Sequence, residues 1–103
     1  MHPLIQQHLA AISELCRRYH VRRLEVFGSA ARGEDFDSEK SDVDFLVEFD
    51  SSALEGFASN YFDFQEALQG LVGRKVDLVS RSAIRNPYFL ADVERTREPL
   101  YEA

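Results

Sequence analysis

Three aspartates lie in apolar surroundings that predict β-strands. Asp42 and Asp44 are two residues apart in the alternating segment 42–49, and Asp77 lies at the centre of the apolar segment 75–79. On a strand, residues two apart point to the same face and lie about 6.6 Å apart. Two carboxylates on one face repel each other, so burying them is costly unless a cation is present. If the two segments are neighbouring strands, all three acids meet at one site.

A site of this kind would suit phosphoryl transfer. Carboxylate oxygens are the ligands that Mg²⁺ prefers, and three of them can hold two ions, one on a triphosphate and one on the attacking hydroxyl. Gly28 and Ser29 directly follow another apolar segment. A glycine lets the backbone approach a ligand closely, and free N–H groups at the start of a helical turn attract an anion. Either motif alone is more often a solvated strand face or a plain turn.

Hydrophobic periodicity predicts the elements that would position these residues. Helical spacing predicts helices over 4–19 and 54–72, and alternation predicts strands over 22–27, 42–49 and 75–80. The residues expected to face the core from the two helices are Ile5, Leu9, Ile12, Cys16 and Tyr19, then Phe57, Tyr61, Phe64, Leu68 and Leu71. Gly73 is expected to end the second helix.

The remaining segments are expected to be short. Ala30 and Ala31 could form one helical turn, and 34–41 is a polar loop. Pro87 can open a last short helix, and the tail 99–101 could dock on the core. The order of helices and strands predicts one α/β domain over residues 1–103, with a short mixed sheet and flanking helices.

Composition limits the classes of protein to consider. The chain has 103 residues, of which 45% are hydrophobic and 29% charged, as in an ordinary globular domain. No apolar run approaches the roughly 20 residues of a membrane span, and the N-terminus has no secretion signal, so we expect a cytoplasmic protein. Twelve basic against 18 acidic residues give a net charge of -6. This balance disfavours direct DNA binding and fits divalent cations or a basic partner.

The combined pattern resembles the signature of the nucleotidyltransferase superfamily, which shares the DNA polymerase beta fold. The matching residues run from Gly28 to Glu34, from Ser41 to Val47 and from Gly73 to Val79. The tail 86–101 is also typical of the group, so the resemblance covers nearly the whole chain. The small size resembles the minimal nucleotidyltransferases, or MNT domains.

The resemblance implies a role for each matching residue. Gly28 and Ser29 would bind the triphosphate of ATP through backbone N–H groups and the Ser29 hydroxyl. Asp42 and Asp44 would bind Mg²⁺. Asp77 would complete a second metal site and act as the base, or assist it.

Two further features of this region bear on access to the site. Arg32 would contact phosphate or lie on the surface. The segment 30–41 has twelve residues, two more than the family pattern. A loop absorbs such an insertion at little cost in free energy, so we expect it to affect access to the site more than the fold.

The resemblance implies Mg²⁺-dependent transfer of AMP from ATP to a hydroxyl. MNT proteins of this kind commonly pair with a HEPN-domain toxin, a helical RNase, so a tyrosine of such a partner is the expected acceptor and antitoxin action the expected role. Two alternatives are an antitoxin that acts by binding alone and transfer to a small molecule of the aminoglycoside type. The complete set of acids favours catalysis, and the absence of a second domain for a small acceptor disfavours the last alternative.

Other residues with chemical potential are expected to be structural. The three histidines show no metal-ligand spacing, and Cys16 lies on the apolar stripe of the first helix. Glu48 shares a strand face with Asp44 but lies farther along it. The aromatic residues exceed what one helix face can bury, so some of Phe57, Tyr61, Phe62, Phe64, Tyr88, Phe89 and Tyr101 could form an exposed patch for a partner.

Overall fold

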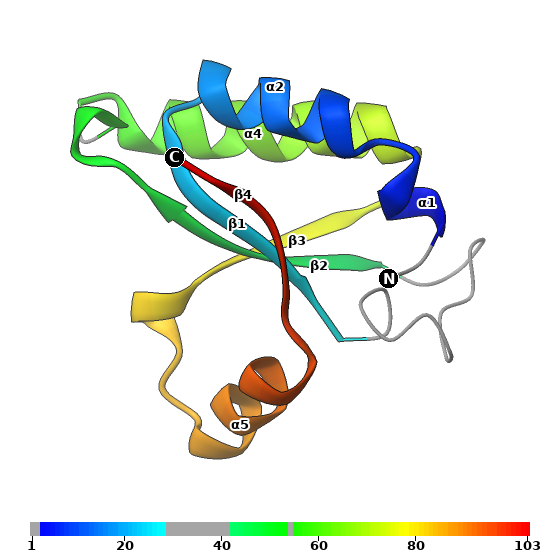
Figure 1. Ribbon diagram of the computed structural model, residues 1–103. Helices are drawn as coiled ribbons and strands as arrows, with labels where there is room; N and C mark the ends of the chain where they lie inside the picture. The colour runs from blue at the N-terminus through cyan, green and yellow to red at the C-terminus, as the bar shows by residue number, and fades with distance from the viewer. Residues whose placement is uncertain (1–2, 29–41, 54) are drawn as a thin grey trace.

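The fold is a four-stranded sheet with helices on both sides (Figure 1). The computed structural model describes residues 3–28, 42–53 and 55–103. Its strands are β1 (Val21–Phe27), β2 (Val43–Phe49), β3 (Val76–Ser80) and β4 (Glu98–Glu102). Its helices are α1 (Pro3–Gln6), α2 (Leu9–Arg18), α4 (Phe57–Val72) and α5 (Pro87–Thr96), with short 3₁₀ turns η1 (Ser51–Ala53) and η2 (Arg81–Ala83). The predicted α/β class with a short mixed sheet is confirmed.

The strand order of the sheet is β3-β2-β1-β4. β1 pairs antiparallel with both β2 and β4, whereas β2 and β3 are parallel. A parallel pair needs a long crossover connection, and α4 supplies it. Because β2 and β3 run in the same direction, both begin at the same edge of the sheet. This topology brings the predicted acidic segments together.

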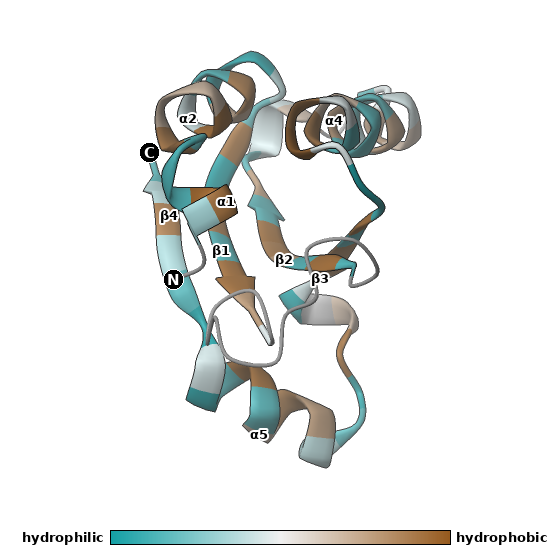
Figure 2. Ribbon diagram, turned by 90° about the vertical axis from the view of Figure 1, so that its right-hand side faces the viewer, coloured by the Kyte–Doolittle hydropathy of each residue, from teal (hydrophilic) through white to brown (hydrophobic). Residues whose placement is uncertain are grey.

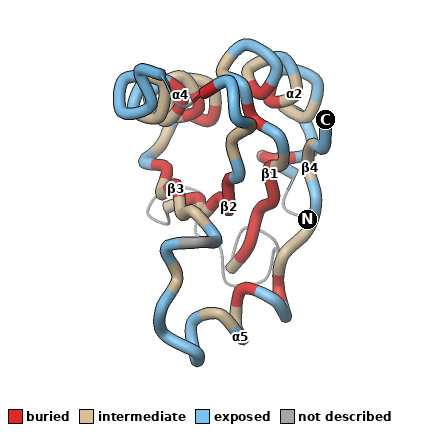
Figure 3. The backbone as a smooth tube through the Cα atoms, turned by 90° about the vertical axis from the view of Figure 1, so that its left-hand side faces the viewer, coloured by how far each residue is buried: buried red, intermediate tan, exposed pale blue. Residues whose placement is uncertain are grey.

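One face of the sheet forms the main core beneath α2 and α4. Alternate residues of β2 point to this face and are buried, as the period of a strand requires. Figure 2 shows the apolar sides of α2 and α4 turned toward the sheet, and Figure 3 shows the buried residues concentrated there. The core includes Val43, Phe45 and Val47 of β2, Leu24 and Val26 of β1, Ile12 and Cys16 of α2, and Phe64, Leu68 and Val72 of α4.

The opposite face is covered only in part, by α5. Phe27, Leu46 and Val93 form a second, smaller apolar cluster there. The Phe27 and Phe89 rings meet edge to face with centroids 5.8 Å apart. Asn86 caps the start of α5, because its side chain accepts a hydrogen bond from the Tyr88 N–H at 2.8 Å. The predicted helix opening at Pro87 is therefore confirmed.

The first predicted helix, 4–19, was expected to be continuous and is instead two helices. The His8 N–H donates to the Ile5 carbonyl at 3.1 Å, in place of the Leu4 carbonyl of a regular α-helix. The His8 ring Nδ1 bonds the Leu4 carbonyl at 2.8 Å. A local side-chain bond of this kind competes with the helical ladder. Ile5 and Ile12 are nevertheless both buried, as predicted.

The second predicted helix begins later than expected and buries a narrower stripe. Gly56 precedes α4 with φ +67°, in the left-handed region, so the helix starts at Phe57. Phe64 and Leu68 are buried as predicted, but Phe57 is 43% exposed, so its placement in the stripe was wrong. Gly73 ends α4 as predicted.

The tail forms a fourth strand that the sequence did not reveal. β4 pairs with β1, with Val26 opposite Glu98 and Leu24 opposite Tyr101. Its sequence, Glu-Pro-Leu-Tyr-Glu, contains a proline and carries charge at both ends. Such residues are found on edge strands and lower the apparent strand propensity of the segment.

Cys16 packs in the main core, as predicted. It is fully buried, and burial raises the pKa of its thiol to about 12, with a small opposing effect of Arg17. A thiol in such surroundings is unreactive at neutral pH. No helix in the described part of the chain is both long and apolar enough to cross a membrane.

Candidate active site

Asp44 and Asp77 lie side by side on neighbouring parallel strands. The register of β2 and β3 places Asp44 opposite Asp77, next to the buried pair of Val43 and Val76. Both acids point away from the face covered by α2 and α4, because the residues that flank them point toward that face. Each side chain is of intermediate exposure. The predicted convergence of these two acids is thus found in the structure.

The surroundings of Asp44 oppose its ionisation. Its pKa is raised from 3.8 to about 6, and the causes, from largest to smallest, are partial burial, the charge of Asp77, a hydrogen bond with the Asp77 side chain and the charge of Asp42. Burial and two like charges destabilise the charged form of this carboxyl, and a bound cation would stabilise it. All the oxygen donors here are hard ligands of the kind that Mg²⁺ prefers.

Asp42 stands just before β2 and has a partner of its own. Its Oδ2 lies 3.7 Å from Nζ of Lys75, a contact between exposed side chains. Within residues 3–28, 42–53 and 55–103, no three His, Cys, Asp or Glu side chains form a group ready to hold a metal ion. The structure therefore draws Asp44 and Asp77 together, with Asp42 near enough to raise the pKa of Asp44.

Gly28 lies directly against the acid pair. Phe27 pairs with Asp44 across β1 and β2, and Gly28 follows with φ +72°. A Cβ at this position would lie 3.1 Å from Oδ2 of Asp44, so only glycine fits without strain. The Gly28 N–H donates to Oγ1 of Thr96 at 3.0 Å. The Gly28 N–H, which was predicted to bind phosphate, is therefore hydrogen-bonded to the Thr96 hydroxyl in this structure.

Other predicted site residues lie outside the described part of the chain. These are Ser29 and Arg32, together with the helical turn expected at Ala30–Ala31 and the loop 34–41. Glu48, expected to be structural, is exposed, and its Oε1 lies 3.9 Å from Nη1 of Arg22.

Two residues that contact members of the predicted site were missed by the sequence reasoning. Lys75 precedes β3 and pairs with Asp42, and its place two residues before Asp77 was a signal that could have been used. Thr96 reaches Gly28 across 68 positions of the chain. Nothing local in the sequence around Thr96 indicates that contact.

Four of the surplus aromatic residues are exposed, and they lie on α4 and α5, on opposite sides of the sheet, so they do not form one patch. The most exposed are Phe57, Phe62, Tyr88 and Phe89, whereas Tyr101 is half-buried between the strand edge and the core. Phe57 and Phe62 both flank Tyr61 on α4, with ring centroids 6.1 and 5.5 Å from it.

Known proteins resemble this chain in both sequence and structure. A relative from Thermococcus cleftensis, named protein adenylyltransferase MntA, is 41% identical over 75 residues, which are 71% of this chain and 69% of that protein. A solved structure provisionally described as a minimal nucleotidyltransferase is 35% identical, with a TM-score of 0.74, and the match covers 93% of this chain and 92% of that one.

A more distant structure adds a likeness of fold. A chain from the complex of a tri-AMPylated Shewanella oneidensis HEPN toxin with its MNT antitoxin matches with a TM-score of 0.61 at 17% identity, over 95% of this chain and 72% of that one. The expected fold of the minimal nucleotidyltransferases is confirmed by these likenesses. The model of the nucleotidyltransferase domain family matches residues 10–99, so the chain, with its paired acids on β2 and β3, belongs to that family of enzymes.

Proposed function

We propose that the protein transfers AMP from ATP to a tyrosine hydroxyl of a partner HEPN toxin and so acts as its antitoxin. The observation that carries the proposal is the in-register pair of Asp44 and Asp77 beside Gly28. In a chain of the nucleotidyltransferase family, this arrangement suits a nucleotide whose phosphates lie at the common edge of β2 and β3.

The residues divide the chemistry between them. The attacking hydroxyl oxygen forms a bond to the α-phosphorus of ATP while the bond to the pyrophosphate oxygen breaks. The Asp77 carboxylate accepts the hydroxyl proton. The backbone of Gly28, with no side chain, leaves room for phosphate beside Asp44. Ser29, next in the chain, would donate a hydrogen bond from its hydroxyl to the triphosphate.

The acids would also hold Mg²⁺. Asp44 and Asp77 are the first candidates because they are adjacent, and Asp42 would join them by leaving Lys75. The bound ions would offset the negative charge of the triphosphate and of the transition state. The exposed ion pair of Asp42 and Lys75 is weak, so its rearrangement costs little.

The proposed partner rests on the relatives. A protein named adenylyltransferase MntA and a complex of an AMPylated HEPN toxin with an MNT antitoxin are both similar to this chain. The net charge of -6 and the exposed aromatic residues fit a surface that binds a basic protein.

A labelling experiment tests the proposal. The protein is mixed with Mg²⁺, ATP labelled at the α-phosphate and the HEPN protein proposed as its partner. The Asp42→Asn, Asp44→Asn double variant removes two acids of the site. The matched control is Asp63→Asn, which removes an exposed acid of α4 away from the site. Mass spectrometry of the labelled partner identifies the acceptor residue.

We expect label on a tyrosine with the wild-type protein and with Asp63→Asn, and none with the double variant. A stable complex without label would instead support an antitoxin that acts by binding alone. Label on a small hydroxyl compound, with none on the protein partner, would contradict the proposed acceptor. Equal labelling by the double variant would contradict the role of the acids.

A further inference from the structure

Thr96 connects the last turn of α5 to the turn that follows β1. Its hydroxyl donates to the Asp92 carbonyl at 2.9 Å, and the Gly28 N–H donates to the same hydroxyl oxygen at 3.0 Å. A hydroxyl has one proton, and a carbonyl can only accept, so that proton is committed to Asp92. A lone pair of Oγ1 therefore faces Gly28. Thr96 is 9% exposed, so water is a poor substitute for either bond.

The backbone that Thr96 holds lies directly beside the Asp44 carboxylate. Gly28 has φ +72°, and a Cβ there would lie 3.1 Å from Oδ2 of Asp44. Glycine is the residue with the widest backbone freedom, so by itself it fixes its position poorly. A hydrogen bond from its N–H to a buried side chain removes much of that freedom.

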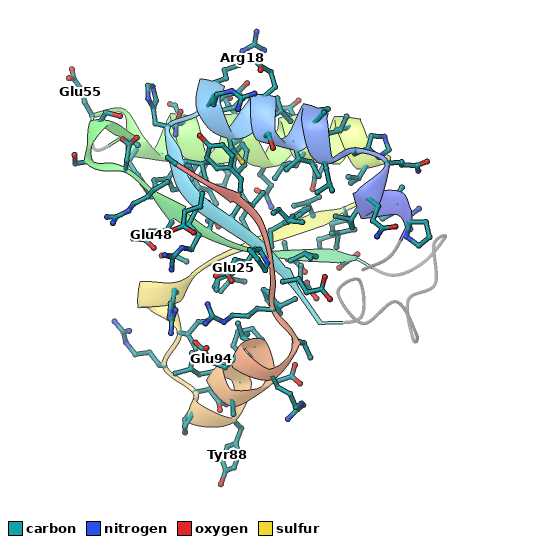
Figure 4. All side chains as sticks on the ribbon, viewed as in Figure 1. Arg18, Glu25, Glu48, Glu55, Tyr88 and Glu94 are labelled. Atoms are coloured by element: carbon teal, nitrogen blue, oxygen red, sulfur yellow. The ribbon has the colours of Figure 1, made fainter. Side chains whose placement is uncertain are left out.

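The helix that carries Thr96 is itself anchored to β1. Phe89 packs edge to face on Phe27, and Val93 is buried in the same cluster. Directly after Thr96, Nη1 of Arg97 contacts Oε1 of Glu25 at 3.1 Å. Figure 4 shows Glu25 on the side of the sheet that faces α5. Contacts on both sides of Thr96 thus give its hydroxyl a fixed place.

We infer that Thr96 is a positioning residue of the active site, which acts by holding Gly28 against Asp44. It touches neither the nucleotide nor the acids in this role. The kinetic part of the inference rests on the proposed function, because it assumes that phosphate binds beside Gly28. A misplacement of a substrate-binding group by about 1 Å can cost on the order of 100-fold in rate.

Two substitutions separate the hydroxyl from the packing of Thr96. Thr96→Val keeps the size and removes the hydroxyl, whereas Thr96→Ser keeps the hydroxyl and removes a methyl group. Two quantities are measured for each variant and the wild type: the exchange rate of the Gly28 amide hydrogen by NMR, and kcat and KM for ATP in the transfer reaction. Circular dichroism checks that the variants fold.

We expect Thr96→Val to accelerate Gly28 exchange about 10-fold and to raise KM for ATP about 10-fold, with a smaller change in kcat. Thr96→Ser should stay within about threefold of the wild type in each quantity. Wild-type exchange and kinetics in Thr96→Val would overturn the inference, as would equal losses in both variants, which would indicate packing alone.

The exchange measurement separates this inference from the proposed function. If the wild type transfers no nucleotide, the proposed function fails, and Gly28 exchange in Thr96→Val against Thr96→Ser still decides whether the hydroxyl fixes that turn. If Thr96→Val does not fold, Thr96→Ala takes its place, because it also removes the hydroxyl and adds no bulk.

Discussion

Two acid sites lie on the same face of the sheet, and only one of them has its negative charge balanced by a basic side chain. Glu25 of β1 is 5% exposed and contacts the Arg97 guanidinium through both carboxylate oxygens, at 3.1 and 3.2 Å. On the next strand along, Asp44 faces another acid, Asp77. Among the described residues, no basic side chain forms an ion pair with either of these two aspartates.

The difference separates a structural acid from a functional one. A buried carboxylate that serves the fold has a fixed cation from the chain, as Glu25 does. The pair of Asp44 and Asp77 raises the pKa of Asp44 and so destabilises its own charged state. Such an arrangement is useful when a cation arrives with the substrate. In the part of the chain that the structure describes, the opposite face, beneath α2 and α4, holds the main apolar core and neither kind of acid site.

Neutralising Asp44 should have the largest effect on the acid site. We expect Asp44→Asn to lower the transfer rate by more than about 10³-fold, or roughly 4 kcal/mol, because it removes a charge from the reaction site. The same change should raise the free energy of unfolding by about 1 kcal/mol at pH 7, since it relieves the repulsion by Asp77. Transfer kinetics and urea denaturation measure the two effects. A loss of stability together with the loss of activity would place Asp44 with the structural acids.

A substitution in the apolar core should instead lower stability and leave the transfer rate almost unchanged. Phe64 of α4 is fully buried in the main core. Phe64→Ala should lower the free energy of unfolding by about 3–4 kcal/mol, through lost burial and a cavity. The rate per folded molecule should change little, because the acids lie on the other face. Urea denaturation gives the first quantity, and transfer assays corrected for the folded fraction give the second.

Removing the cation of the Glu25 and Arg97 pair should leave Glu25 as a second acid without a balancing charge. Arg97→Met should lower the free energy of unfolding by about 2 kcal/mol, a value reduced from that of a fully buried pair because Arg97 is partly exposed. The double variant Glu25→Gln, Arg97→Met should recover most of the loss. The denaturation midpoints of the single and double variants measure the coupling, and a double variant as unstable as Arg97→Met would show that packing, not charge, sets the cost.

The acid pair should also make stability depend on pH. The folded pKa of Asp44, about 6, lies above its usual 3.8. Between these values the folded protein holds a proton that the unfolded chain has released, so this group makes the free energy of unfolding fall as pH rises from about 4 to about 6, with no further change above. Because Asp44 is only half-buried, we expect a change of about 1–2 kcal/mol.

Denaturation at several pH values in the presence of a chelator measures this effect. The wild type is compared with Asp44→Asn, so that other titrating groups cancel in the difference. The stability advantage of Asp44→Asn should grow between pH 4 and pH 6. A constant difference would mean that Asp44 titrates normally. Added Mg²⁺ should reduce the advantage at pH 7 if the acids bind it.

The sequence predicted the acids of the site better than the residues and the strand that hold the site in place. Alternation identified the strands of Asp44 and Asp77, since each aspartate is flanked by apolar residues that can point only to the core. Their adjacency stayed a condition of the prediction, and the parallel pairing of β2 with β3 supplies it. Thr96 could not be found in this way, because its contact with Gly28 spans 68 residues and depends on the path of the last helix. β4 was missed because edge strands favour proline and charge, which weaken the strand pattern.

Phe62 gives the smallest predicted effect and the closest comparison with the core. It lies two residues before Phe64 on α4 but is 63% exposed, whereas Phe64 is 0% exposed. The two side chains differ by about 200° around the helix, so identical residues face solvent and core. Phe62→Ala should change the free energy of unfolding by less than about 0.5 kcal/mol, because little apolar surface is buried there. Urea denaturation of Phe62→Ala beside Phe64→Ala measures both. If Phe62→Ala instead cost as much as Phe64→Ala, the exposed side of α4 would be buried in solution, and sedimentation would then be expected to show self-association of the protein through that helix.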